Sequence, residues 1–259
     1  MLEKYFKNKK NFITYITACD PDCDTFIDIV KVLEQNGVDI LEIGVPFTDP
    51  MADGPTIQRA FERVLKKKIN LDMIFDTIKK IREFSNIPIV LFGYYNVFYN
   101  YNKEKLIKKF KELNIQGFLC VDLPPDEDEE LIKDLKRIGV DIIYLITPTT
   151  TEERIKFIID KASGFIYYVS LTGTTGAREK LREDLENRVK LIKNNTDLPV
   201  AVGFGISKKE HIEEISKFAD GIIVGSAIIK IIEQNIDDKK KLLAELSKFI
   251  KQLTSPLRS

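Results

Sequence analysis

Eight short apolar runs, rich in isoleucine and valine, alternate along the chain with longer amphipathic stretches. A short apolar run predicts a buried strand, whereas apolar residues at three- and four-residue spacing predict a helix that packs on one face. The predicted strands are residues 12–17, 40–44, 89–93, 117–123, 141–146, 165–169, 200–204 and 221–225. Near-continuous apolar strands that are joined by helices indicate a parallel sheet covered on its outer face.

Eight strand–helix units in 259 residues predict an α/β fold, a closed (β/α)8 TIM barrel formed by a single domain, residues 1–259. Two helical patterns, 56–67 and 70–84, follow the second strand, and another covers 237–252, so the barrel is expected to carry extra helices. The alternative is an open doubly wound sheet. No Gly-x-Gly-x-x-Gly motif opens the first predicted helix, which disfavours that alternative.

Two carboxylates stand at the carboxyl end of the second predicted strand. Alternation along residues 40–44 places Glu42 on the same face as Gly44, where the strand should be buried. Asp53 follows in a proline-rich loop before the next helix. Taken alone, each is most simply a hydrogen-bonded structural residue. Together they form a pair with one carboxyl desolvated and the other near solvent, which is how two carboxyls acquire acid and base roles.

Composition narrows the chemistry further. Lysine plus arginine and aspartate plus glutamate both total 40, which gives no reason to expect nucleic acid or an anionic membrane as a partner. The single histidine, His211, makes a serine–histidine triad or a histidine-rich metal site unconvincing, so no metal is expected. Three cysteines are too few for a disulfide scaffold and suggest a reducing compartment. Together with the lack of a signal-peptide core, they predict a cytoplasmic protein.

The last two predicted strands end in loops suited to an anion. Gly205 follows the seventh strand, and Gly225 with Ser226 opens the helix after the eighth. Backbone N–H groups at such loops and the positive end of a helix favour phosphate, and barrels of this class commonly bind phosphate there. The loop after the sixth strand contains Gly176 and is interpreted as a lid that also contacts the phosphate, with an ordinary flexible connection as the alternative.

Several aromatic residues follow the third predicted strand, in a loop over 93–101 that includes Asn96. Aromatic side chains in a loop suggest either a pocket wall or a protein interface, although some could simply pack beneath the loop.

Taken together, these segments resemble the tryptophan synthase α subunit family, from residues 13–17 to residues 225–228. The most specific stretch is residues 41–58, LEIGVPFTDPMADGPTIQ. The resemblance implies cleavage of indole-3-glycerol phosphate to indole and glyceraldehyde 3-phosphate without a cofactor. It also implies an α2β2 complex whose β subunit carries pyridoxal phosphate and receives the indole for tryptophan biosynthesis.

The resemblance also implies roles for individual residues. Glu42 matches the acid/base glutamate, Asp53 the catalytic aspartate, and Tyr167 a tyrosine beside that glutamate. The other matched positions are the phosphate ligands Gly176, Gly205, Gly225 and Ser226, the indole-pocket residue Tyr15, the lid threonine Thr175, and the β-subunit contacts Asp49 and Asn96. The lid departs from the family pattern at Leu171 and Thr174. These differences bear on how the lid closes and couples to the partner, more than on the cleavage chemistry.

Three other functions share part of this pattern. A phosphosugar isomerase would use the same phosphate loops on a non-aromatic substrate. A non-catalytic activator would only dock on a β partner, and a free-standing lyase would need no partner at all. The carboxylate pair favours an enzyme, and the 41–58 segment favours the indole substrate.

Overall fold

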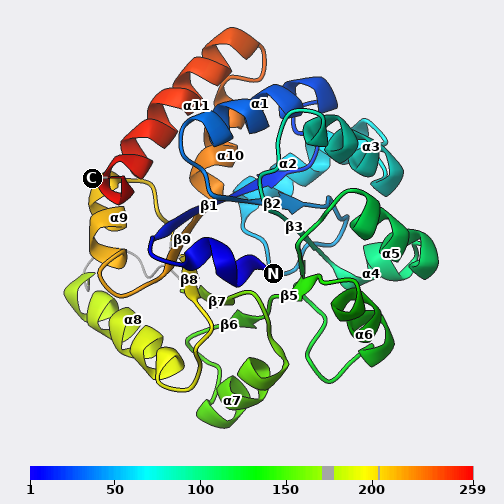
Figure 1. The fold of residues 1–259 in the computed structure, drawn as a ribbon. Helices are drawn as coiled ribbons and strands as arrows, with labels where there is room; N and C mark the ends of the chain where they lie inside the picture. The colour runs from blue at the N-terminus through cyan, green and yellow to red at the C-terminus, as the bar shows by residue number, and fades with distance from the viewer. Residues whose placement is uncertain (171–177, 204, 259) are drawn as a thin grey trace.

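Parallel strands form a ring with helices outside it (Figure 1). The structure is a computed structural model that describes residues 1–170, 178–203 and 205–258. Its strands are β1 (Asn11–Thr17), β2 (Ile40–Gly44), β3 (Ile89–Gly93), β4 (Gly117–Cys120), β5 (Asp141–Ile142), β6 (Leu145–Ile146), β7 (Ile166–Val169), β8 (Val200–Gly203) and β9 (Gly221–Val224).

The sheet order is β5-β4-β3-β2-β1-β9-β8-β7-β6, and every pairing is parallel. The two strands at its edges, β5 and β6, are consecutive in the chain and are separated only by Ile143 and Tyr144. The Ile143 N–H donates to the Phe118 carbonyl on one side (2.9 Å), and the Tyr144 carbonyl accepts from the Tyr167 N–H on the other (3.2 Å). The single strand expected over 141–146 is therefore interrupted, and it joins both edges of the sheet. The closed (β/α)8 barrel is confirmed, and the open sheet is excluded.

The helices form the outer layer of the barrel. They are α1 (Cys23–Gln35), α2 (Pro55–Lys66), α3 (Leu71–Arg82), α4 (Tyr95–Tyr99), α5 (Lys103–Glu112), α6 (Glu129–Arg137), α7 (Glu152–Lys161), α8 (Arg178–Lys193), α9 (Lys209–Ile215), α10 (Ser226–Gln234) and α11 (Lys239–Thr254), with 3-10 turns at η1 (Leu2–Phe6) and η2 (Ser255–Leu257).

Two of the expected extra helices are present. Helices α2 and α3 both lie between β2 and β3, and α11 packs against α1, α9 and α10 on one side of the ring. The expected aromatic loop after β3 is a short helix, α4. No helix in the described ranges combines the length and apolarity that crossing a bilayer would require.

The amino end of the barrel is closed by η1, which lies at the centre of the ring in Figure 1. Leu2 and Phe6 are buried, and the Phe6 ring lies 5.6 Å from that of Phe165, just before β7. The Leu2 N–H donates to the buried carboxylate of Asp141, the first residue of β5. A functional site is therefore confined to the other end, where the strands finish.

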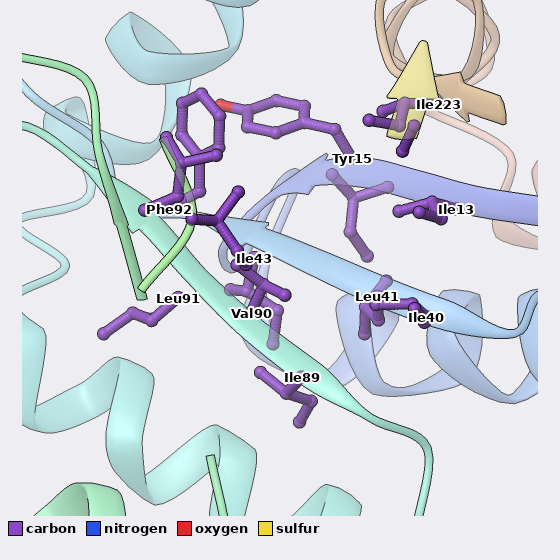
Figure 2. Packing of buried hydrophobic residues seen from close by; sticks show 14 of the residues in the cluster. Ile13, Tyr15, Ile40, Leu41, Ile43, Ile89, Val90, Leu91, Phe92 and Ile223 are labelled. Atoms are coloured by element: carbon purple, nitrogen blue, oxygen red, sulfur yellow. The ribbon is translucent and has the colours of Figure 1, made fainter. Parts of the chain in front are cut away.

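Isoleucine, valine and leucine side chains fill the space around β1, β2 and β3 (Figure 2). Burial of each such side chain contributes roughly 1.5–3 kcal/mol. At the upper end of this region the aliphatic packing gives way to two aromatic rings, Tyr15 and Phe92, which meet edge to face with 5.1 Å between centroids.

Candidate active site

Glu42 occupies the middle of β2 with its side chain completely buried. Its neighbours in register are Tyr15 on β1 and Val90 on β3. Neither carboxyl oxygen has a hydrogen-bond partner among the described residues. Burial therefore raises the pKa of Glu42 to about 8, and the group is a neutral carboxylic acid at neutral pH.

The Glu42 side chain points into the barrel. Tyr167 lies on β7, on the opposite side of the ring from β2, and its pKa is raised first by burial and then by the charges of Glu42 and Asp53. Two strands so placed can interact only through the barrel interior. The Tyr167 hydroxyl also borders β8, because a Cβ on Gly203 would lie 2.8 Å from it. Tyr167 and Glu42 thus both face the barrel interior.

Asp53 lies in the loop between β2 and α2, partly exposed at the mouth of the barrel. The Tyr94 hydroxyl donates a 2.6 Å hydrogen bond to Asp53 Oδ2 and accepts one from the Ala52 N–H (3.1 Å). Burial raises the pKa of Asp53, and the Tyr94 hydrogen bond opposes that rise. Tyr94 was not identified from the sequence, where it is one of several aromatic residues after β3.

The space beside Gly44 is filled, contrary to the simplest interpretation of a glycine next to Glu42. The Tyr15 side chain crosses from β1 and lies over Gly44, and its hydroxyl is buried with no hydrogen-bond partner among the described residues. Burial raises the pKa of Tyr15, and the charges of Asp53 and Glu42 raise it further.

We expect Gly44→Ala to impair the site without unfolding the protein. A Cβ on residue 44 would overlap the Tyr15 hydroxyl and lie 2.6 Å from Tyr15 Cε2. The ring cannot retreat towards β3 because Phe92 occupies that side, so it must move into the mouth of the barrel. Overpacking of this kind costs about 1–3 kcal/mol. The expected result is a rise of roughly 10-fold in the KM for an aromatic substrate, with a far-UV circular dichroism spectrum like that of the wild type. An unchanged KM would show that the Tyr15 ring does not border the substrate.

The expected phosphate loops border one cavity, which extends along α10 to Gln234 and to Phe249 on α11. Gly205 and Ser226 line one cavity of about 400 Å³ together with Ser207, Thr56 and Lys230. Gly225 precedes α10, and its carbonyl accepts from the Ile228 N–H (2.9 Å), so Ser226 lies at the first turn of that helix. Thr56, from the start of α2, was not expected at this cavity.

Tyr15 also connects the two ends of the site. A Cβ on Gly225 would lie 3.2 Å from Tyr15 Cβ, while the hydroxyl of the same side chain lies over Gly44. The Tyr15 side chain therefore runs from Gly225, next to Ser226 of the anion cavity, to Gly44, two residues after Glu42.

Four sequence expectations concern the rim of the mouth. Asp49 and Asn96 are exposed on the segments that follow β2 and β3, and Asn96 lines a second cavity, of about 370 Å³, with Pro46 and Phe47. Thr175 and Gly176 lie outside the described residues.

The cysteines and the histidine differ in part from expectation. Cys19 and Cys23 form a disulfide between the loop after β1 and the start of α1, although the sequence suggested reduced cysteines. Cys120 is free and buried. The sequence predicts a solvent-facing helical position for His211, which lies on α9 but is half-buried. In the part of the chain that the structure describes, no three histidine, cysteine or acidic side chains gather as a metal site.

Comparison with known proteins places these features in one family. The family model described as "Tryptophan synthase alpha chain" matches residues 2–257. Curated relatives of that name include one from Petrotoga mobilis, 44% identical over 252 residues (97% of this chain and 98% of the relative). Another, from Methanocaldococcus jannaschii, is 44% identical over 240 residues, which are 92% of this chain and 85% of the relative.

Solved structures agree. Tryptophan synthase subunit alpha from Legionella pneumophila has a TM-score of 0.91 at 33% identity, covering 99% of this chain and 98% of that one. A chain from the tryptophan synthase a2b2 complex of Pyrococcus furiosus has a TM-score of 0.88 at 36% identity, covering 95% and 99%.

Proposed function

Because the chain belongs to the tryptophan synthase alpha chain family, we propose that it cleaves indole-3-glycerol phosphate to indole and glyceraldehyde 3-phosphate. One observation carries this proposal. A neutral, buried Glu42 and the hydrogen-bonded Asp53 belong to β2 and the loop after it, and the Tyr15 side chain runs from Gly44 of that strand to Gly225, next to Ser226 of an anion cavity. The active unit is the whole chain as one domain, and the site would be in the cytoplasm.

Glu42 would act first as an acid. Breaking the bond between the indole ring and the glycerol chain requires the ring to accept the bonding electrons. The neutral Glu42 carboxyl protonates ring carbon 3, and the resulting ion has an electron-poor ring. The Glu42 carboxylate then takes the proton of the adjacent chain hydroxyl as the carbon–carbon bond breaks. The hydroxyl becomes the aldehyde, the electron pair returns to the ring, and Glu42 regains its proton. The cycle needs no cofactor from this chain.

Asp53 would act at the ring nitrogen. Its carboxylate accepts a hydrogen bond from the ring N–H while positive charge develops on the protonated ring. The Tyr94 hydrogen bond supports this role, because it stabilises the charged carboxylate. Tyr167 lines the interior beside Glu42, and the Tyr15 ring offers the indole an aromatic surface.

The phosphate would bind at Gly205, Gly225 and Ser226, at the amino end of α10. Binding of the phosphate holds the indole ring beside the two carboxyls. Such positioning lowers the activation barrier, because the substrate has already lost its freedom of movement when the reaction begins.

A β subunit that carries pyridoxal phosphate would receive the indole in an α2β2 complex. The related Pyrococcus furiosus structure is described as an a2b2 complex. The exposed Asp49 and Asn96, beside the 370 Å³ cavity at the rim of the mouth, are the proposed contacts for the β subunit.

Indole release from indole-3-glycerol phosphate, measured with and without a cognate β chain, tests the function. We expect indole in both cases and faster release with the β chain. Release at the same rate without it would support a free-standing lyase. No indole in either case, with activation of the β chain, would support a docking activator. Turnover of a phosphosugar alone would support an isomerase.

The pH profile of kcat/KM should be bell-shaped. Glu42 must be protonated, so activity should fall as pH rises through its pKa of about 8. Asp53 must be ionised, and its pKa is raised, so activity should fall on the acid side at a higher pH than for an ordinary aspartate. Tyr94→Phe removes the hydrogen bond that lowers the Asp53 pKa. It should move the acid limb to higher pH and leave the alkaline limb in place. A profile flat through pH 8 would contradict the acid role of Glu42.

A further inference from the structure

A cluster of four charged side chains outside the site joins three elements that surround it. Arg63 on α2 donates two hydrogen bonds to Asp20 in the loop after β1 (3.0 and 2.8 Å), and a third to Glu233 on α10 (3.0 Å). Arg59, one turn earlier on α2, donates two more to Glu233 (2.6 and 2.8 Å). Two of these pairs are bidentate, which fixes orientation as well as distance.

The part of the cluster around Asp20 and Arg63 is set into the protein, whereas the Arg59 side chain is 48% exposed. The Asp20 side chain is completely buried, and the side chains of Arg63 and Glu233 are 20% and 25% exposed. Isolated pairs on a protein surface contribute little to stability, but a bidentate network around a buried carboxylate is held in one arrangement.

Both helices joined by Glu233 begin at the proposed active site. Helix α2 starts two residues after Asp53, and Thr56 in its first turn lines the anion cavity. Helix α10 starts at Ser226, which lines the same cavity. Because an α-helix is stiff over three turns, a clamp at Arg59 and Arg63 also fixes how far apart the helix starts lie.

We propose that Arg59, Arg63 and Glu233 are positioning residues that set the spacing between the Asp53 end and the phosphate end of the site. This inference rests on the function proposed above, since it concerns one substrate that binds at both ends. Inorganic phosphate can keep its contacts with Gly205 and Ser226 when Thr56 moves with α2, and indole has no contact at the anion cavity, so neither ligand should depend strongly on the spacing. A ligand that spans both ends loses affinity when the spacing changes.

Glu233→Gln separates these cases, because it keeps the size of the side chain and removes its charge. The probes are inorganic phosphate, indole, and indole-3-propanol phosphate, which carries both groups on an uncleavable chain. Calorimetry should give Kd values for phosphate and indole within about twofold of the wild type. The Kd for the linked compound should rise roughly 10-fold, and kcat should fall with it, because displacements of about 1 Å can cost up to 10²-fold.

A second variant and a control show whether the effect comes from the clamp or from the loss of any surface charge. Arg59→Gln breaks the same clamp from the α2 side and should give the same pattern. Arg63 is left intact because its removal would strand the buried Asp20 charge. Glu129→Gln makes the same chemical change in an exposed pair with Lys133 within α6, and should change none of the three affinities.

Equal losses for phosphate and for the linked compound would mean that the clamp only supports the anion cavity, which would overturn the inference. So would an unchanged affinity for the linked compound in both variants. Failure of the proposed function would be visible in the wild-type protein instead, which would then neither bind the linked compound nor release indole.

Discussion

Glu42→Gln is expected to abolish indole release from indole-3-glycerol phosphate. The glutamine amide can neither give a proton to ring carbon 3 nor take one from the chain hydroxyl. Each positioned proton transfer is worth roughly 10²–10⁴-fold, and Glu42 serves in two, so a loss of at least about 10⁴-fold is expected. The measurement is indole formed over hours, quantified by chromatography. Substantial remaining activity would assign the proton transfers to another group.

The same variant has a stability signature that separates chemistry from folding. Wild-type Glu42 has a folded-state pKa of about 8 against an ordinary value of 4.5, so the folded state retains a proton that the unfolded state releases. Its contribution to the free energy of unfolding is therefore full below about pH 4.5 and is lost as pH rises to about 8. Glutamine does not titrate.

Urea unfolding at about pH 6 and about pH 9 measures this difference. The wild type should lose more stability than Glu42→Gln between the two values. Parallel losses would mean that the Glu42 carboxyl is hydrated or paired in solution, and its proposed acid role would then lack its physical basis.

The sequence predicts the carboxyl end of β2 well because one rule governs it. Alternation along residues 40–44 gives Glu42 one of only two faces, and its apolar neighbours Ile40, Leu41 and Ile43 imply that both faces are buried. Desolvation then raises the pKa of Glu42, because no other group offsets it. The barrel follows in the same way from repeated strand–helix units.

Local rules of alternation and burial do not predict contacts between segments that are far apart in the chain. Tyr94 is 41 residues from Asp53 in the chain, and the Tyr15 ring reaches Gly44 only because β1 and β2 pair in one particular register. A shift of that register would place the ring elsewhere without altering the hydrophobic pattern. The Arg63–Glu233 pair spans 170 residues and leaves no local signal.

The interruption between β5 and β6 has a related cause. After Asp141 the run 142–146 is continuous and apolar, so its pattern predicts one strand. Closing a barrel requires neighbouring strands to be staggered, and here β5 pairs with β4 while β6 pairs with β7. That division depends on the whole ring and not on the residues of the segment.

Asp53→Asn is expected to reduce kcat by roughly 10²–10⁴-fold while leaving the fold and the phosphate cavity intact. The asparagine oxygen can still accept the 2.6 Å hydrogen bond from Tyr94, so the loop keeps its anchor and only the negative charge is lost. The affinity for indole-3-propanol phosphate should change little, because that compound develops no positive charge on its ring. Near-normal kcat would remove Asp53 from the mechanism.

The pH profile of Asp53→Asn provides an independent check of the separate roles assigned to Asp53 and Glu42. If Asp53 governs the acid limb and Glu42 the alkaline limb, the variant should lose the acid limb and keep the decline near pH 8. Loss of both limbs would mean that the two carboxyls titrate as a coupled pair, for which separate acid and base assignments have no meaning. Burial alone raises the pKa of Glu42, and burial with the Tyr94 hydrogen bond sets that of Asp53, so neither carboxyl shifts the other and independent titration is the expected outcome.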